Sequence, residues 1–380
     1  MIKYFKYKKK YLDLKQFGGL NSLLYMTFKK ILNTHPDGGL NPITSTKMFL
    51  FRYEYYTNIF NKDNDIYYIL SRTDLLSNFF NELNLKIESI QEINKLKEYK
   101  INFIKLNLDL IQPILYISEF INLQYLTFGF WFDQSIEPLE CLINLKHITF
   151  GHTFRQSIDP LAGLINLEHL SFDNYFNKSI KPLEGLKNLK HISFKSSSSF
   201  NQPIDALAEL VNLEYLKFGY FFNQPINALK KLVNIKHLEF NYSFNQPIDS
   251  LADLVYLKKL TFYQYFNQPI DALAKLVNLQ QLNFDYFFNK PIDVLAGLNN
   301  LQQLTFGVYF NQPIDALSGL INLQELTFET NFNQSIEKLS GLTNLKSLIF
   351  INNTYKIPFR DQLQKILPGL VIRNKYYSNR

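Results

Sequence analysis

The chain has 380 residues, of which 46% are hydrophobic and 19% charged, and this balance excludes a disordered polypeptide. Its one cysteine, Cys141, excludes a disulfide framework. No run of 18 apolar residues occurs, so no membrane span is expected. The 35 Phe and 24 Tyr, against a single Trp, indicate that aromatic positions recur along the chain.

The net charge of +7 is concentrated at the two ends of the chain. Residues 1–100 hold 16 Lys and Arg against 10 Asp and Glu, and residues 356–380 hold 6 against 1, which leaves 18 against 22 between them. A basic end can lie on nucleic acid or on an anionic membrane surface, but it is more commonly a solvated terminus. The mixed charge of the centre argues against a phosphate-binding groove, so no nucleic-acid partner is expected.

Residues 1–83 form a basic, aromatic-rich N-terminal region. Its first ten residues lack the long apolar core of a secretory signal, which favours an intracellular, cytoplasmic protein. Helical patterns occur at Asn21–Leu32 and Leu75–Leu83, and Met48–Phe51 is apolar enough to contribute to a core. We therefore predict a small helical domain that docks on the segment that follows.

Residues 84–355 are dominated by an internal repeat. The motif Phe-Asn-Gln-Pro/Ser-Ile recurs every 22 residues, with one step of 24 that contains the run Ser196–Ser199. About 11 units are expected, preceded by decayed units at 84–108 that cap the first one. The phenylalanines of the motif are Phe132, Phe154, Phe176, Phe200, Phe222, Phe244, Phe266, Phe288, Phe310 and Phe332.

Each unit contains two apolar periods. In the unit that begins at Leu301, Leu304-Thr305-Phe306 alternates as a short strand does, whereas Ile314, Leu317 and Leu320 are spaced by three, as 3₁₀ turns require. A strand, a turn and a tight helical return are thus predicted for every unit. Such a short unit cannot bury its own apolar face, so the units must stack into a parallel sheet over a continuous row of phenylalanine rings.

Two polar columns accompany the phenylalanines and are interpreted as framework. The motif asparagines are expected to pair with backbone groups at the turn. The aspartates that follow the motif isoleucine are expected to cap the N-terminus of the helical return. These aspartates are Asp159, Asp205, Asp249, Asp271, Asp293 and Asp315.

Residues 356–380 are predicted to form a basic C-terminal cap. Ile366, Leu367 and Leu370 are its apolar residues, and they are expected to cover the last phenylalanine of the solenoid.

The repeating unit resembles the FNIP repeat, a leucine-rich-repeat variant found in amoebal proteins and in large DNA viruses that infect amoebae. Its period of 22 residues is also similar to that of the bacterial internalin repeat. The resemblance implies an α/β leucine-rich-repeat solenoid, with a curved parallel β-sheet on the concave side and short 3₁₀ or helical returns on the convex side. It also implies that one origin of the chain is a virus, in which case the protein would act in the cytoplasm of the host cell.

No catalytic signature occurs in the sequence. Phosphate-binding glycine loops, H-E-x-x-H and C-x-x-C are all absent, so the protein is not expected to be an enzyme or to hold a cofactor or metal. Cys141 stands where other units carry Gly163 or Gly185, and it is interpreted as a small residue on the helical side.

One outward-facing column stands out on the expected concave face. It holds four of the six histidines, and together with Lys217 from the neighbouring column it is the candidate partner-binding face. Three interpretations remain open: a surface that binds a protein, copies inherited through repeat duplication, or a metal site without carboxylate or thiolate ligands at fixed spacing. The candidate residues are Tyr125, His147, His169, His191, Tyr215, Lys217, His237 and Lys259.

The predicted function is a non-enzymatic scaffold for protein–protein interaction, with an unidentified protein as the partner. The alternative implied by the resemblance is a substrate adaptor of a ubiquitin ligase with an F-box in its N-terminal region. An F-box usually opens with a Leu-Pro pair, and residues 20–100 contain none.

Overall fold

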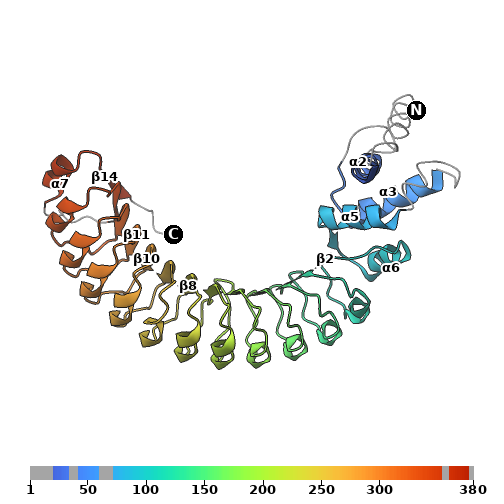
Figure 1. The fold of residues 1–380 in the computed structure, drawn as a ribbon, viewed down its shortest axis with the longest axis horizontal. Helices are drawn as coiled ribbons and strands as arrows, with labels where there is room; N and C mark the ends of the chain where they lie inside the picture. Colours follow the sequence, from blue (N-terminus) through green and yellow to red (C-terminus); the bar gives the residue numbers. More distant parts are fainter. Residues whose placement is uncertain (1–19, 34–41, 60–71, 353–358, 376–380) are drawn as a thin grey trace.

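The computed structural model describes residues 20–33, 42–59, 72–352 and 359–375. Within them the chain winds into an open arc, with strands along its inner side and short helical turns along its outer side (Figure 1). This is the curved solenoid that the repeat predicts. The opening Met1–Lys10 lies outside the described residues.

Among the described residues, 14 parallel strands form a single sheet in which each strand pairs with its neighbours in the chain. The register is one repeat unit, so that Leu260, Leu282 and Leu304 lie side by side and point into the core. The strands are β1 (Lys86–Ile87), β2 (Lys105–Leu108), β3 (Tyr125–Phe128), β4 (His147–Thr149), β5 (His169–Phe172), β6 (His191–Phe194), β7 (Tyr215–Lys217), β8 (His237–Phe240), β9 (Lys259–Phe262), β10 (Gln281–Phe284), β11 (Gln303–Phe306), β12 (Glu325–Phe328), β13 (Ser347–Ile351) and β14 (Val371–Lys375).

The helical returns are 3₁₀ turns, as the apolar spacing of three predicts. The aspartate prediction was wrong: the cap of η5 is Ile204, whose carbonyl accepts from Leu207 N, and Asp205 lies one position too late to cap. The turns are η1 (Leu115–Glu119), η2 (Glu137–Leu139), η3 (Asp159–Leu161), η4 (Lys181–Leu183), η5 (Asp205–Glu209), η6 (Asn227–Lys231), η7 (Asp249–Leu251), η8 (Asp271–Lys275), η9 (Asp293–Gly297), η10 (Asp315–Gly319) and η11 (Glu337–Gly341).

Two columns of phenylalanine rings form the centre of the core. The ten motif phenylalanines are at most 1% exposed, and successive rings stack nearly parallel, for example Phe222 on Phe244 at 6.1 Å between centroids. The strand phenylalanines stack beside them, with Phe240 only 3.9 Å from Phe244. The predicted row of buried rings is confirmed, and it is doubled.

A ladder of asparagines holds the turns in register. The backbone N–H of Asn223 donates to Asn201 Oδ1 at 2.9 Å, and the backbone N–H of Asn245 donates to Asn223 Oδ1 at the same distance. Where a glutamine follows the asparagine, it adds a second donor, as Gln224 Nε2 does to Asn201 Oδ1. The predicted pairing of these asparagines with backbone is confirmed.

A second asparagine ladder was not predicted. Asn144 Nδ2 donates to the carbonyl of Ile121 at 2.8 Å, and the equivalent bond recurs from Asn166 to Ile143 and from Asn300 to Val277. These residues lie in the loop between the 3₁₀ turn and the next strand. The two ladders thus tie neighbouring units together at both ends of the strands.

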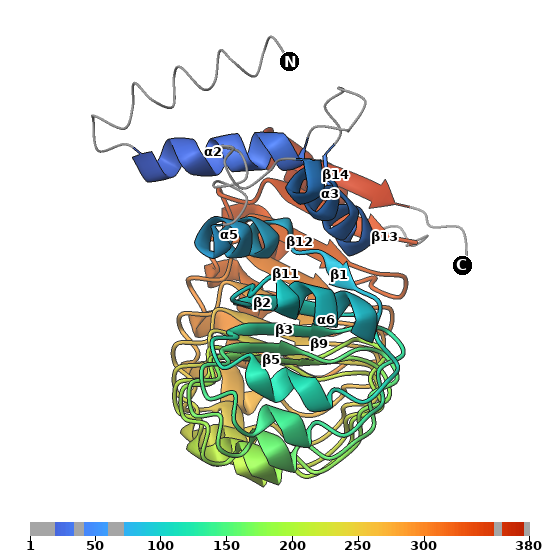
Figure 2. The same ribbon diagram turned by 90° about the vertical axis from the view of Figure 1, so that its right-hand side faces the viewer.

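Helices close the N-terminal end of the sheet. They are α2 (Leu20–Leu32), α3 (Thr46–Ile59), α5 (Thr73–Leu83) and α6 (Ile90–Glu98). Figure 2 shows α2, α3 and α5 beyond β1, and the Arg52 guanidinium of α3 is buried and donates to the Leu32 carbonyl at the end of α2. One cluster of buried side chains runs from Phe28 to Leu370, so the helices share their core with the solenoid. A separate domain at residues 1–83 stays a prediction.

The C-terminal end is closed by α7 (Arg360–Ile366) and β14. Leu363 and Leu370 are buried there, whereas Ile366 is 49% exposed. The prediction for Ile366 was therefore wrong, because Ile366 is the last residue of α7 and its side chain stays half exposed, while Leu363 makes the buried contact of this helix. Leu367 packs partly buried against the core, and the Arg360 guanidinium lies 5.7 Å from the centre of the Phe350 ring.

Candidate functional site

The candidate column runs along the inner face of the arc. Each of its residues is the first residue of a strand, and the register pairs Tyr125 with His147, His147 with His169, and His169 with His191. The column continues through Tyr215 and His237 to Lys259. Because the next residue of every strand points into the core, these side chains point out of the concave face.

The rings of this column form a continuous stack. Centroids are 4.4 Å apart for Tyr125 and His147, 4.2 Å for His147 and His169, 5.3 Å for His169 and His191, and 4.2 Å for His191 and Tyr215. His237 ends the stack, with its ring edge-on to Tyr215 at 6.0 Å. The buried Phe222–Phe244 pair, deeper in the molecule, is wider at 6.1 Å, as the curvature of the sheet requires.

Burial within the stack controls the charge of the imidazoles. Desolvation lowers the pKa of His147, His169 and His237, and it lowers the pKa of His191 to about 4, with the neighbouring His169 as the next contribution. His191 Nδ1 is buried and has no hydrogen-bond partner among the described residues. The stack from Tyr125 to Tyr215 therefore presents neutral, half-buried rings at neutral pH, and the His237 ring at its end is exposed.

The two lysines of the candidate face, in β7 and β9, share a carboxylate of β8. Lys217 Nζ is 3.2 Å from one oxygen of Glu239, and Lys259 Nζ is 3.5 Å from the other. Glu239 is buried and belongs to the column next to the stack, where Lys217 also stands. Two cations around one carboxylate leave this part of the concave face with a net positive charge.

A row of exposed aromatic residues at the ends of the strands was missed by the sequence analysis. It includes Trp131, which is 64% exposed, and Tyr175, Phe221, Tyr265 and Tyr309. Neighbouring rings stack here too, as Tyr265 and Tyr309 do on either side of Phe287 at 5.2 Å each. The available signal was the frequent aromatic residue directly before the motif phenylalanine. Serines of the 24-residue unit interrupt this row.

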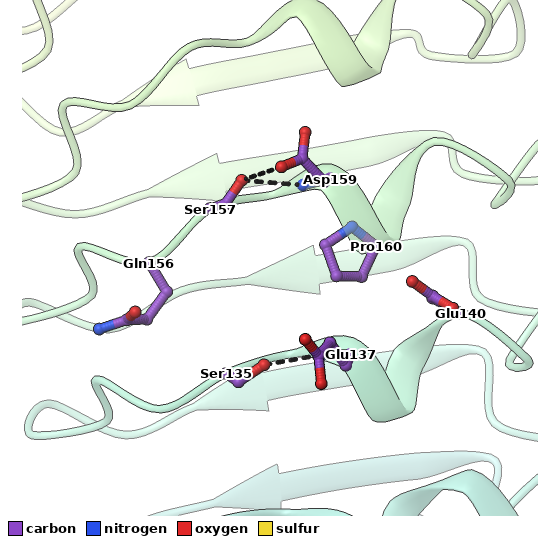
Figure 3. Close-up of a pocket in the computed structure, with 7 residues that line it drawn as sticks. All are labelled: Ser135, Glu137, Glu140, Gln156, Ser157, Asp159 and Pro160. Carbon is purple, nitrogen blue, oxygen red and sulfur yellow. Dashed lines mark hydrogen bonds between the residues drawn. The ribbon is translucent and has the colours of Figure 1, made fainter.

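Acidic hollows, metal ligands and thiols are the other features of the described surface that bear on its chemistry. A shallow hollow between η2 and η3 is lined by the carboxylates of Glu137, Glu140 and Asp159 (Figure 3). The described residues contain no group of three or more His, Cys, Asp or Glu placed to hold a metal ion. Cys141 is exposed, and its thiol lies 3.6 Å from the carbonyl oxygens of Ser118 and Pro138. Of the described helices, none is both long and apolar enough for a transmembrane segment.

The parallel sheet, the 3₁₀ returns and the two asparagine ladders define a leucine-rich-repeat solenoid. Solved structures with this fold include an internalin of Listeria monocytogenes, which is 22% identical with a TM-score of 0.56 over 70% of this chain and 78% of its own. A leucine-rich-repeat protein of Leptospira interrogans is 18% identical with a TM-score of 0.57, over 79% of this chain and 86% of its own.

The Toll protein of Drosophila, solved in complex with Spätzle, is similar as well. It is 15% identical with a TM-score of 0.61, and the match covers 80% of this chain and 45% of that one. No family model matches this chain, and no curated protein matches it. The comparisons therefore establish the fold.

Proposed function

We propose that this protein is a non-enzymatic scaffold that binds another protein on its concave face. The observation that carries the proposal is the uninterrupted ring stack from Tyr125 to His191 and Tyr215, which offers half-buried apolar rings with polar tips. Aromatic side chains of this kind are common anchors at protein interfaces, because they bury much area at little cost in conformational entropy. The Drosophila Toll structure, a leucine-rich-repeat neighbour, was solved in complex with Spätzle.

The electrostatics of the face support a protein partner over nucleic acid. The stack is neutral, and the lysines beside it gather at one place, Lys195 next to Asp173 and Lys217 with Lys259 around Glu239. A groove for a nucleic-acid backbone requires cations along its whole length, and here they are confined to one part of the face. A cytoplasmic place of action and an FNIP-type origin rest on the sequence alone.

The test uses binders selected from a displayed protein library on the immobilised full chain. A variant that carries His147→Asn, His169→Asn and His237→Asn removes the rings without adding charge, and we expect it to lose most of these binders at least about tenfold in affinity. The matched control carries Glu140→Asn, Lys187→Asn and Lys275→Asn on the convex side, where all three side chains are exposed. Binders that ignore the first variant but lose affinity to the second would place the interface elsewhere.

A further inference from the structure

A second hollow lies on the concave side where β6 and β7 meet, directly beside the ring stack. Its volume is about 320 Å³, and its lining includes His191, Ser193, Lys195, Ser196, Ser197 and Lys217. It coincides with the one unit of 24 residues, near the middle of the arc in Figure 1.

The two inserted residues explain why the hollow forms at this place. The chain leaves β6 in a turn closed by a hydrogen bond from Ser198 N to the Lys195 carbonyl, and Ser198 is fully buried. The strand phenylalanines on either side, Phe194 and Phe218, are 6.1 Å apart, close to the 6.0 Å of Phe328 and Phe350 where no residue is inserted. The core spacing is therefore ordinary, and the inserted turn itself forms one wall of the hollow, to which it contributes Ser196 and Ser197.

Gly219 shows how closely the turn approaches the next unit. A Cβ atom at this position would lie 2.4 Å from Ser198 Cβ and 2.5 Å from the Lys195 carbonyl oxygen. The next unit thus fixes the inserted turn in place. The wall of the hollow that this turn forms consequently has a fixed position.

Donors of hydrogen bonds dominate the lining. Two ammonium groups and three serine hydroxyls line the hollow, and among the described residues no carboxylate does. Tyr215 adds a phenol, and burial raises its pKa to about 12, so that it keeps its proton. The hollow in Figure 3 has the opposite character, because three carboxylates and no cation line it.

The two lysines are held in place and keep spare donors. Lys195 Nζ is 2.5 Å from Asp173, and Lys217 Nζ is 3.2 Å from Glu239, which Lys259 also contacts. An ammonium group has three N–H donors, so a single carboxylate leaves donors available on each. The three lysines and two carboxylates together carry a net positive charge.

We propose that this hollow binds an anionic side chain, a carboxylate or a phosphate, of the protein that lies along the concave face. The inference rests on the proposed function, because it assigns one subsite within that interface. Ammonium and hydroxyl donors around one small volume match the acceptor oxygens of either anion. The hollow is next to the stack at His191 and Tyr215, so one partner can contact both.

The experiment titrates the full chain with inorganic phosphate and, separately, with acetate, at constant pH and ionic strength. Labelled histidines are followed by NMR, since the His191 ring lines the hollow and reports binding directly. We expect a saturable shift of the His191 signal, and at least about fivefold weaker phosphate binding in the Lys195→Gln/Lys217→Gln variant. The control variant Lys187→Gln/Lys275→Gln, with two exposed convex lysines, is expected to bind as the wild type does.

The two anions distinguish a phosphorylated side chain of the partner from a carboxylate side chain. A response to phosphate alone assigns the hollow to a phosphorylated side chain, and a response to acetate, alone or with phosphate, assigns it to a carboxylate or to either group. No saturable response to either anion, or an equal response in the lysine variant, overturns the proposal. If the double variant does not fold, Lys195→Gln alone serves, because that side chain is 67% exposed.

The subsite and the proposed function can fail separately. Small anions need no partner, so the titration tests the hollow even if no protein binds the concave face. Conversely, loss of library binders in the His147, His169 and His237 variant would support the scaffold even if the hollow ignores both anions.

Discussion

His191 is the residue whose environment differs most from water along the ring stack. Its neighbours His169 and Tyr215 cover both faces of the ring, and its pKa is lowered to about 4 from an ordinary value of 6.5. Between these two pH values the unfolded chain binds a proton that the folded chain does not. Stability contributed by the neutral ring is therefore complete above pH 6.5 and is lost as the pH falls toward 4.

The first prediction concerns this loss of stability at low pH. The difference in the free energy of unfolding between the wild type and His191→Gln should shrink by roughly 1–2 kcal/mol as the pH falls from 7 to 4.5, after a discount for the partial exposure of the ring. Urea unfolding of both proteins across this pH range measures the difference. A difference that does not vary with pH would contradict the assigned protonation state.

Glu329 provides a control with the opposite sign. Burial, with a smaller contribution from Asp285, raises its pKa to about 7 from 4.5. The folded chain then holds the extra proton, so this contribution to stability is complete below pH 4.5 and is lost as the pH rises through 7. Glu329→Gln should accordingly gain stability relative to the wild type at pH 8 but not at pH 4.5.

At the scale of the element, the ends of the strands limit which residues fit. A Cβ atom on Gly151, two residues after β4, would lie 1.8 Å from the Gly129 carbonyl oxygen, whereas one on Gly163, two residues after η3, would meet nothing within 4 Å. Two glycines 12 residues apart in the same unit thus have different roles.

Gly151→Ala should therefore destabilise the protein by about 1–3 kcal/mol, because the backbone of the preceding unit must move. Gly163→Ala should be neutral or slightly stabilising, since alanine loses less conformational entropy on folding. Midpoints of urea unfolding compare the two variants. Equal midpoints would show that the strand ends are less closely packed than the structure indicates.

The elements also show what the sequence could and could not predict. The fixed period predicts the positions of the strands, the 3₁₀ turns and the buried phenylalanines. Each of these features follows from the residue type that recurs at one position of the unit. The period does not reveal which backbone group an aspartate or asparagine contacts, so Asp205 was assigned as a cap and the ladder through Asn144 was missed. The His191 column was found, but its lowered pKa depends on ring distances that no pattern contains.

On the scale of the whole molecule, the solenoid is a linear series in which each unit contacts its neighbours. Its end caps should therefore control local stability more than distant stability. Leu363 of α7 is fully buried against the last unit, and Ile366 of the same helix is 49% exposed. Substitutions at these two positions therefore distinguish the effect of the buried contact of the cap from the effect of changing any residue of its helix.

Leu363→Ala should remove about 2–5 kcal/mol of local stability and speed amide hydrogen exchange in β12, β13 and β14, while β3 to β6 keep the protection of the wild type. Ile366→Ala should leave exchange unchanged throughout. Hydrogen exchange read by mass spectrometry resolves these segments. Faster exchange along the entire sheet would mean instead that the arc opens as one cooperative block.

The asparagine ladder has a consequence for the length of the molecule. Every rung joins the same two atoms of consecutive units, as the backbone N–H of Asn245 and Asn223 Oδ1 do, so the ladder has no preferred number of rungs. Excision of 22 residues between two such asparagines would rejoin a donor and an acceptor identical to those removed. As far as this ladder is concerned, the arc can therefore be lengthened or shortened in whole steps of about 4.8 Å with every rung intact.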